Sequence, residues 1–268
     1  MTVSRALTTR PVAKVWGRDH LPPPFTGFDG QRIGEIWFEP PPELPELLVK
    51  YIFTSESLSV QVHPSDADAP HGSRGKDECW LILSADPGSR LAVGFRESVP
   101  PDTMRAAALD GSIEDLLEWH TVEPGDFFYL PAGTVHAIGA GISLIEIQQN
   151  SDVTYRLYDY DRPRELHLDE AVAVANGTRP DSACHSRVPS RGSLRLVDGP
   201  RFRLDLVEGP PTDSTRDRFA ERLFLVIPID GQVTLGRAAI DPGGCGIAEN
   251  LCEVNCDAST RFLVVQPV

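Results

Sequence analysis

The sequence lacks any apolar run approaching the roughly 20 residues that a membrane-spanning helix needs. Its first residues, MTVSRALTTRPVAKVWG, contain no apolar core of the kind that a secretory signal carries. These two absences favour a cytoplasmic protein with no membrane partner.

Cysteine is also scarce. There are five cysteines, an odd number, and no CxxC pair among them. Cys252 and Cys256 are spaced CxxxC, but neither a second such pair nor a nearby histidine accompanies them. We expect reduced, mostly structural thiols in a reducing compartment.

Basic residues are too few to balance the acidic ones. The chain has 25 Lys and Arg against 39 Asp and Glu, which gives a formal net charge of −14. Such a charge repels phosphate backbones, so nucleic acid is not an expected partner. A small anion can still bind wherever several Lys or Arg side chains gather locally.

Turn-forming residues are frequent, with 24 prolines and 22 glycines, and they separate short runs rich in Val, Ile, Leu and Phe. This pattern predicts an all-β barrel or sandwich. The expected strands are 33–38, 47–53, 58–63, 79–83, 91–95, 126–130, 142–147, 201–207, 222–229 and 261–265.

Few helices are expected. Residues 102–119 contain one or two, with Ser112 as a plausible N-cap, and residues 169–176 form another that Gly177 is placed to end. The polar stretch 178–192 has no apolar period and is predicted to be a linker. It would join a barrel with helical decoration, 1–177, to a second set of strands, 193–268.

Two histidines and two other polar residues have the types and spacing of metal ligands. Gln61 and His63 are two apart in an expected strand, so their side chains point to the same face. An amide oxygen and an imidazole suit a borderline divalent metal. Glu78 is the last acid before the apolar strand 79–83. Taken singly, each is as consistent with an ordinary surface or turn residue.

The segment 124–139 is more informative. Pro124-Gly125-Asp126 makes a turn, residues 127–130 (FFYL) a strand, and residues 131–136 (PAGTVH) a turn that puts His136 at the start of the next strand. This order is similar to the second sequence motif of the cupins. Gln61, His63 and Glu78 precede it in the right order, so with His136 they form an open, catalytic type of ligand set.

Over residues 16–162 the sequence resembles the type I mannose-6-phosphate isomerases (phosphomannose isomerases), in their short bacterial form. The matching segments are Trp16-Gly17, 34–37 (GEIW), 58–64 (LSVQVHP), 75–78 (GKDE), 131–137 (PAGTVHA) and 145–160 (IEIQQNSDVTYRLYDY). The resemblance implies cupin jelly-roll barrels, the first binding metal and the second degenerate. It implies one divalent metal, usually Zn²⁺, on Gln61, His63, Glu78 and His136.

The resemblance also implies the reaction and its residues. Mannose 6-phosphate and fructose 6-phosphate would be interconverted, with Arg156 as the active-site arginine and Lys76 and Glu146 as further catalytic groups. Ser59, Lys50 and Arg156 would bind the sugar phosphate. The chain is expected to be a monomer or a homodimer.

Several roles stay open. Glu146 is either the base, with a pKa raised by burial, or a group that only orients a ligand or Arg156. Lys76 either shuttles protons or holds the anion. Arg156 suits a phosphate or a developing oxyanion, but it could instead pair with Asp152 or Asp159.

The resemblance weakens in two places. Residues 193–268 have no His or acid at ligand spacing, and Asp77 and Cys79 stand where the family usually has other residues, which puts the sugar preference in doubt. The alternatives are an isomerase for a different or unphosphorylated aldose, a cupin that binds sugar phosphate without chemistry, and a metal-dependent oxygenase.

Overall fold

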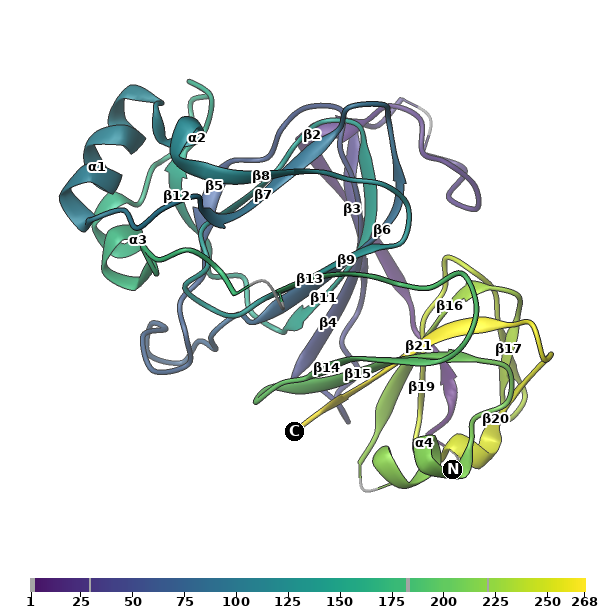
Figure 1. Ribbon diagram of the computed structural model, residues 1–268. Coiled ribbons are helices and arrows are strands. Elements are labelled where there is room, and N and C mark those ends of the chain that lie inside the picture. The colour runs from purple at the N-terminus through teal and green to yellow at the C-terminus, as the bar shows by residue number, and fades with distance from the viewer. Residues whose placement is uncertain (1–2, 29, 182–183, 221) are drawn as a thin grey trace.

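The computed structural model describes residues 3–28, 30–181, 184–220 and 222–268, and it consists of two antiparallel β-barrels packed side by side (Figure 1). The first barrel is made of a seven-stranded and a five-stranded sheet. The larger sheet has the order β13 (His185–Arg187), β9 (Asp126–Leu130), β6 (Glu78–Ala85), β11 (Ile142–Gln149), β4 (Leu47–Phe53), β3 (Ile33–Phe38), β2 (Thr9–Arg18). The smaller has the order β12 (Tyr155–Tyr158), β5 (Val60–Val62), β10 (His136–Ile138), β7 (Arg90–Phe95), β8 (Leu117–Thr121).

The second barrel repeats this architecture on a smaller scale. Its larger sheet has the order β1 (Arg5–Ala6), β19 (Gly246–Ala248), β16 (Phe224–Asp230), β21 (Arg261–Pro267), β15 (Phe202–Glu208), β14 (Leu194–Asp198). A three-stranded sheet, β18 (Ala238–Ile240), β17 (Val233–Leu235) and β20 (Val254–Cys256), covers it. The predicted all-β, cupin-type fold is confirmed.

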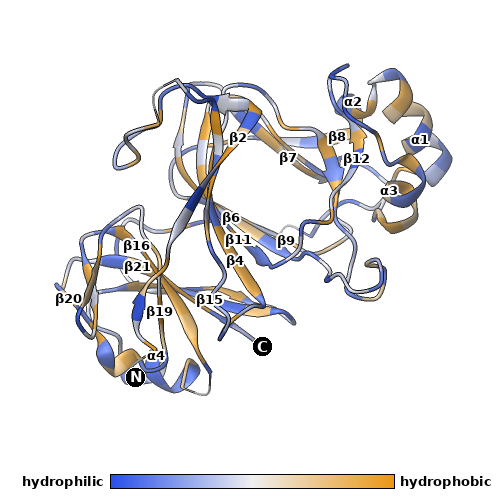
Figure 2. Cartoon of the chain, turned by 180° about the vertical axis from the view of Figure 1, so that it is seen from behind, coloured by the Kyte–Doolittle hydropathy of each residue, from blue (hydrophilic) through white to orange (hydrophobic). Residues whose placement is uncertain are grey.

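Strand β4 explains how the barrels join. All seven of its residues are buried, because it has a barrel interior on one face and the other barrel on its second face. Val49, Tyr51 and Phe53 pack in the core that the two larger sheets share, together with residues such as Leu204 and Leu263 of the second barrel. Figure 2 shows the resulting hydrophobic stretches along β4, β11 and β15. The alternate residues of β4 are thereby left to line the first barrel.

In the described part of the chain, the strands are accompanied by α1 (Pro101–Asp110), α2 (Ile113–Leu116), α3 (Leu168–Val174), α4 (Asp213–Arg218) and the 3₁₀ turn η2 (Leu251–Glu253). The first three gather beside β12 at one end of the first barrel (Figure 1).

The stretch 102–119, expected to contain one or two helices, has two, α1 and α2, but its last residues are not helical. Residues 117–121 form β8, which pairs with β7, so tertiary pairing overrides the local helical pattern. Gly111, at φ 81°, ends α1. Ser112 is not a side-chain cap, because its hydroxyl donates to Asp110. The helix at 168–174 ends before Gly177, whose carbonyl accepts from the Val99 N–H.

The chain crosses the predicted domain limits twice. Strand β1 pairs with β19 of the second barrel, and β13, within the expected linker 178–192, pairs with β9 of the first. The division into 1–177, 178–192 and 193–268 stays a prediction. No helix in the described part of the chain is long and apolar enough to cross a membrane.

Candidate metal centre and adjoining cavity

Polar side chains form a band across the inner face of the seven-stranded sheet. In the antiparallel register Glu146 of β11 lies between Lys50 of β4 and Trp80 of β6. Two residues further along β11, Gln148 lies opposite Glu78 of β6. Side chains alternate along a strand, so all five project into the first barrel. Charged groups are thereby placed inside an otherwise apolar barrel.

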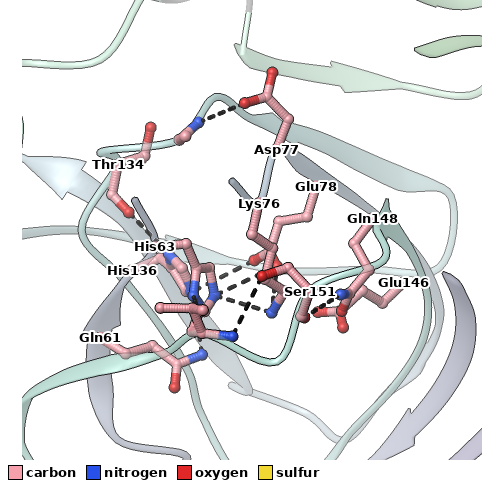
Figure 3. A network of polar contacts seen from close by, with 12 residues as sticks. Gln61, His63, Lys76, Asp77, Glu78, Thr134, His136, Glu146, Gln148 and Ser151 are labelled. Carbon is pink, nitrogen blue, oxygen red and sulfur yellow. Dashed lines mark hydrogen bonds and ion pairs between the residues drawn. The ribbon is translucent and has the colours of Figure 1, made fainter. Parts of the chain in front are cut away.

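Three of the four predicted metal ligands meet at one end of this band (Figure 3). Ligand atoms of His63, Glu78 and His136 all lie within 4.8 Å of one another, and the three residues are buried. The two Nε2 atoms lie 3.5 Å (His63) and 3.3 Å (His136) from the Glu78 carboxylate. A buried carboxylate facing two imidazole nitrogens is the donor set of a divalent metal.

Backbone carbonyls orient both imidazoles. The Nδ1–H of His63 donates to the carbonyl of Val153, and that of His136 to the carbonyl of Thr134, each at 2.9 Å. The lone pair of each ring is therefore on Nε2, facing Glu78. Burial lowers the pKa of both histidines, to about 4 for His136, so the rings are in the neutral form that binds metal.

Gln61, the fourth predicted ligand, lies directly opposite His136 in the β5–β10 pair. Its amide nitrogen is 3.2 Å from Nε2 of His136, and its amide oxygen accepts a hydrogen bond from Ser59. The oxygen therefore points toward Ser59, and turning the amide by 180° would bring it to the side of His136 Nε2.

The Lys76 ammonium is in direct contact with this cluster. Its Nζ lies 2.9 Å from Oε2 of Glu78 and 3.0 Å from Nε2 of His63, and the side chain is buried. Apart from this ion pair, the Glu78 oxygens have no hydrogen-bond partner among the described residues. Burial alone would lower the pKa of Lys76, but Glu78 and Glu146 raise it, so Lys76 stays charged.

Glu146 is held as a buried carboxylate anion. Lys50 donates to its Oε1 at 2.9 Å, and the Trp80 indole donates to its Oε2 at 3.1 Å. Burial alone would raise its pKa, but Lys50 and Lys76 hold the pKa well below its ordinary value. Of the two alternatives for Glu146, the one with a raised pKa is not what the structure has, because Lys50 on β4 and Lys76 just before β6 outweigh the effect of burial.

Lys50 itself is largely committed to other protein groups. Besides Glu146 it donates to Oε1 of Gln148 at 2.6 Å, and its Nζ lies 4.7 Å from the centre of the Trp37 ring. An ammonium has three N–H donors, so one remains for a further acceptor.

A cavity of about 210 Å³ adjoins the cluster, between β2 and β3 on one side and β5 and β12 on the other. All five predicted catalytic and substrate-binding residues line it: Lys50, Ser59, Lys76, Glu146 and Arg156. A larger hollow of about 660 Å³, with Asp86 and Gly139 in its wall, lies at the opposite ends of the strands that begin with Glu78 and His136.

The charges around the smaller cavity are mostly positive. Five cationic side chains (Lys14, Lys50, Lys76, Arg156, Arg164) face three carboxylates (Glu35, Glu146, Asp152). Lys76 and Arg164 are paired with carboxylates outside this lining, Glu78 and Asp159, so among the described residues the cation left unpaired at the cavity is Arg156. The cavity is thus suited to a small anion.

Arg156 lies opposite Gln61 in the β12–β5 pair. Its guanidinium makes no ion pair within the described ranges of the chain, because Asp159 pairs instead with Arg162 and Arg164. The alternative in which Arg156 pairs with Asp152 or Asp159 is therefore not what the structure has.

The sequence did not single out Lys14, Glu35 or Arg164 as cavity residues. Glu35 stood in the matching GEIW segment, and its alternation with Ile36 was a signal for an inward-facing carboxylate. Lys14 and Arg164 are in ordinary charged stretches, and only the folded chain brings them to the cavity.

The two departures from the family pattern do not line the cavity. The Asp77 carboxylate accepts from the Tyr129 hydroxyl and the Ala132 N–H, so it ties down the turn before His136. Cys79 packs in the core between the barrels.

Comparison with known proteins identifies relatives of the chain. No protein-family model matches it. It is 36% identical over 200 residues to a mannose-6-phosphate isomerase of Streptococcus mutans, covering 71% of this chain and 63% of that protein. It is 44% identical over 137 residues to mannose-6-phosphate isomerase ManA of Bacillus subtilis, covering 48% and 43%. The match thus spans less than two thirds of the length of each of these relatives.

Solved structures agree over nearly the whole chain. The mannose 6-phosphate isomerase of Bacillus subtilis has a TM-score of 0.77 at 23% identity, covering 98% of this chain and 99% of that one. A putative mannosephosphate isomerase of Archaeoglobus fulgidus has a TM-score of 0.75 at 17% identity, covering 100% and 98%. At these identities the likeness concerns the fold.

Fold and site together define a cupin-type protein with a buried His–Glu–His cluster suited to a divalent metal. By sequence, 71% of the chain is similar to a mannose-6-phosphate isomerase of Streptococcus mutans at 36% identity.

Proposed function

We propose that the chain is a metal-dependent aldose–ketose isomerase that interconverts mannose 6-phosphate and fructose 6-phosphate. The observation that carries this proposal is a cavity lined by the buried Glu146 carboxylate and by Arg156, which adjoins the His–Glu–His cluster through Lys76. The names of the relatives support the same reaction.

The metal is proposed to be Zn²⁺, held by His63, Glu78 and His136, with Gln61 as fourth ligand once its amide is turned. The donor set fits, because two neutral imidazoles and a carboxylate are zinc ligands, and among the described residues Lys76 is the Lys or Arg side chain paired with Glu78. When bound, the metal supplies polarisation of the sugar oxygens at C1 and C2.

Glu146 is proposed as the base. The aldose loses the hydrogen at C2 and the ketose gains one at C1, so a group inside the cavity must take up and return that proton. Glu146 is ionised and shielded from bulk water, and Trp80 and Lys50 fix its orientation. Lys76 then carries the proton that passes from the C2 hydroxyl to the C1 oxygen.

The phosphate is proposed to bind to Arg156, with Ser59 and the third N–H of Lys50 as additional donors. Arg156 presents a planar fork of donors to the cavity, and no carboxylate among the described residues pairs with it to compete with an anion. The charge of Arg156 would attract the sugar phosphate despite the negative net charge of the chain.

The test is a coupled assay for fructose 6-phosphate formed from mannose 6-phosphate, with chelator and then with added zinc. Turnover should disappear with chelator and return with zinc. Arg156→Ala should lower kcat/KM by about 10²–10⁴-fold, a loss of several kcal/mol of transition-state binding, while zinc stays bound.

Arg203→Ala, in a charged pair on the second barrel, is the matched control and should leave the rate unchanged. Activity that survives in Arg156→Ala would remove Arg156 from the site. If the zinc-loaded protein converts only free aldoses, an isomerase for unphosphorylated sugars becomes the better assignment, and the absence of any turnover favours a sugar-phosphate-binding cupin.

A further inference from the structure

The Lys76 ammonium contacts the same atoms that the proposed metal would use. Its Nζ lies 3.0 Å from Nε2 of His63 and 2.9 Å from Oε2 of Glu78 (Figure 3). Because Nδ1 of His63 donates to the Val153 carbonyl, Nε2 carries the only lone pair of the ring. A hydrogen bond to this lone pair and a bond from it to a metal exclude each other.

We propose that Lys76 and the metal compete for His63 and Glu78, and that metal binding moves the ammonium from the cluster toward Glu146. This inference rests on the metal site proposed above. It gives Lys76 a role before any chemistry: its charge holds the buried ligands together until a stronger cation replaces it.

The cavity offers the displaced ammonium a place to go. Lys76 lines this cavity together with Glu146. Each Glu146 oxygen accepts one hydrogen bond, Oε1 from Lys50 and Oε2 from Trp80, and a carboxylate oxygen can accept a second. Metal binding would thus deliver a proton donor to the space that the sugar enters, so metal and substrate sites are prepared in one step.

The proposal predicts a direction for metal affinity. With Lys76 in place, the metal must break a buried ion pair and bind beside a positive charge, so removing that charge should tighten binding. Lys14 provides a matched control: it is a second cationic residue of the same cavity, but it pairs with Glu35 at 3.3 Å, whereas Lys76 pairs with Glu78.

Zinc titration of the purified chain against a chromophoric chelator is the direct test. Lys76→Met and Lys76→Gln should each lower the zinc Kd by at least about tenfold, as expected for a charge within a few ångströms. Lys14→Met should change the Kd by less than about threefold, since its charge lies outside the cluster.

The outcomes are separable. If both folded Lys76 variants, checked by circular dichroism, bind zinc no more tightly than the wild type, competition is refuted while the metal site stands. If the wild type takes up no zinc, the proposed metal site fails and this inference fails with it.

A zinc-loaded crystal structure provides a measurement without a variant. The distance from Lys76 Nζ to His63 Nε2 should lengthen well beyond hydrogen-bond range, with Nζ closer to Glu146. A zinc ion bound by His63 while Lys76 keeps its 3.0 Å contact would overturn the proposal.

Discussion

The two barrels share an architecture but fill their interiors differently. The interior of the first holds buried charged residues such as Lys50, Lys76, Glu78 and Glu146. The core of the second is a cluster of apolar side chains, among them Phe224, Phe262 and Val264. The same packing of antiparallel sheets therefore surrounds a cluster of charged groups in one half of the chain and an apolar core in the other, because a site requires specific side chains as well as a fold.

The difference has an energetic side. In the first barrel, Lys50 pairs with Glu146 and Lys76 with Glu78, which offsets the desolvation of these four charges without making them strong sources of stability. In the second barrel a buried amide, Gln266, donates to two backbone carbonyls and so serves the structure only. We expect the second barrel to contribute stability and the first to contribute function.

Removing a predicted metal ligand of the first barrel should have the largest effect, a loss of metal binding and activity. His136→Ala should abolish metal binding and isomerase activity, because His136 supplies one of three clustered ligand atoms. Metal content by elemental analysis and the coupled assay would measure both. His185→Ala is the control, since His185 stacks on Phe128 outside the cluster. Full activity with bound zinc in His136→Ala would exclude His136 as a ligand.

A mutation that creates a cavity in the apolar core of the second barrel should lower the stability of the fold and leave metal binding unchanged. Phe262→Ala should cost about 3–5 kcal/mol of unfolding free energy, because Phe262 is fully buried in an apolar cluster. Chemical denaturation would measure it, with the exposed Leu109→Ala on α1 as the control. Zinc stoichiometry of the folded Phe262→Ala protein should be unchanged, and a loss of zinc at full folding would show that the barrels are coupled.

Zinc binding to the first barrel should raise the free energy of unfolding, by a smaller amount than Phe262→Ala lowers it. At a free concentration of 100 times the Kd, a ligand specific for the folded state adds about 2.7 kcal/mol. The melting temperature should therefore rise with zinc in the wild type and in Phe262→Ala, but not in His136→Ala. An equal rise in all three proteins would place the zinc elsewhere.

Much of the strand pattern could be predicted because it depends on local features. The strands 33–38 and 126–130 have the predicted bounds, since each is an apolar run bounded by turn residues. Residues 117–121 could not be assigned this way. Their neighbours favour a helix, and their pairing with β7 depends on contacts that the local sequence does not contain.

The sequence by itself determined the β architecture, the types of the predicted ligands and their order along the chain, because short-range patterns and family motifs encode them. Only the tertiary structure decided the charge state of Glu146 and the contacts of Lys76. Both depend on distances between strands, as in the 2.9 Å between Lys50 and Glu146, which are 96 residues apart. Electrostatic effects of this kind follow separation in space and not in sequence.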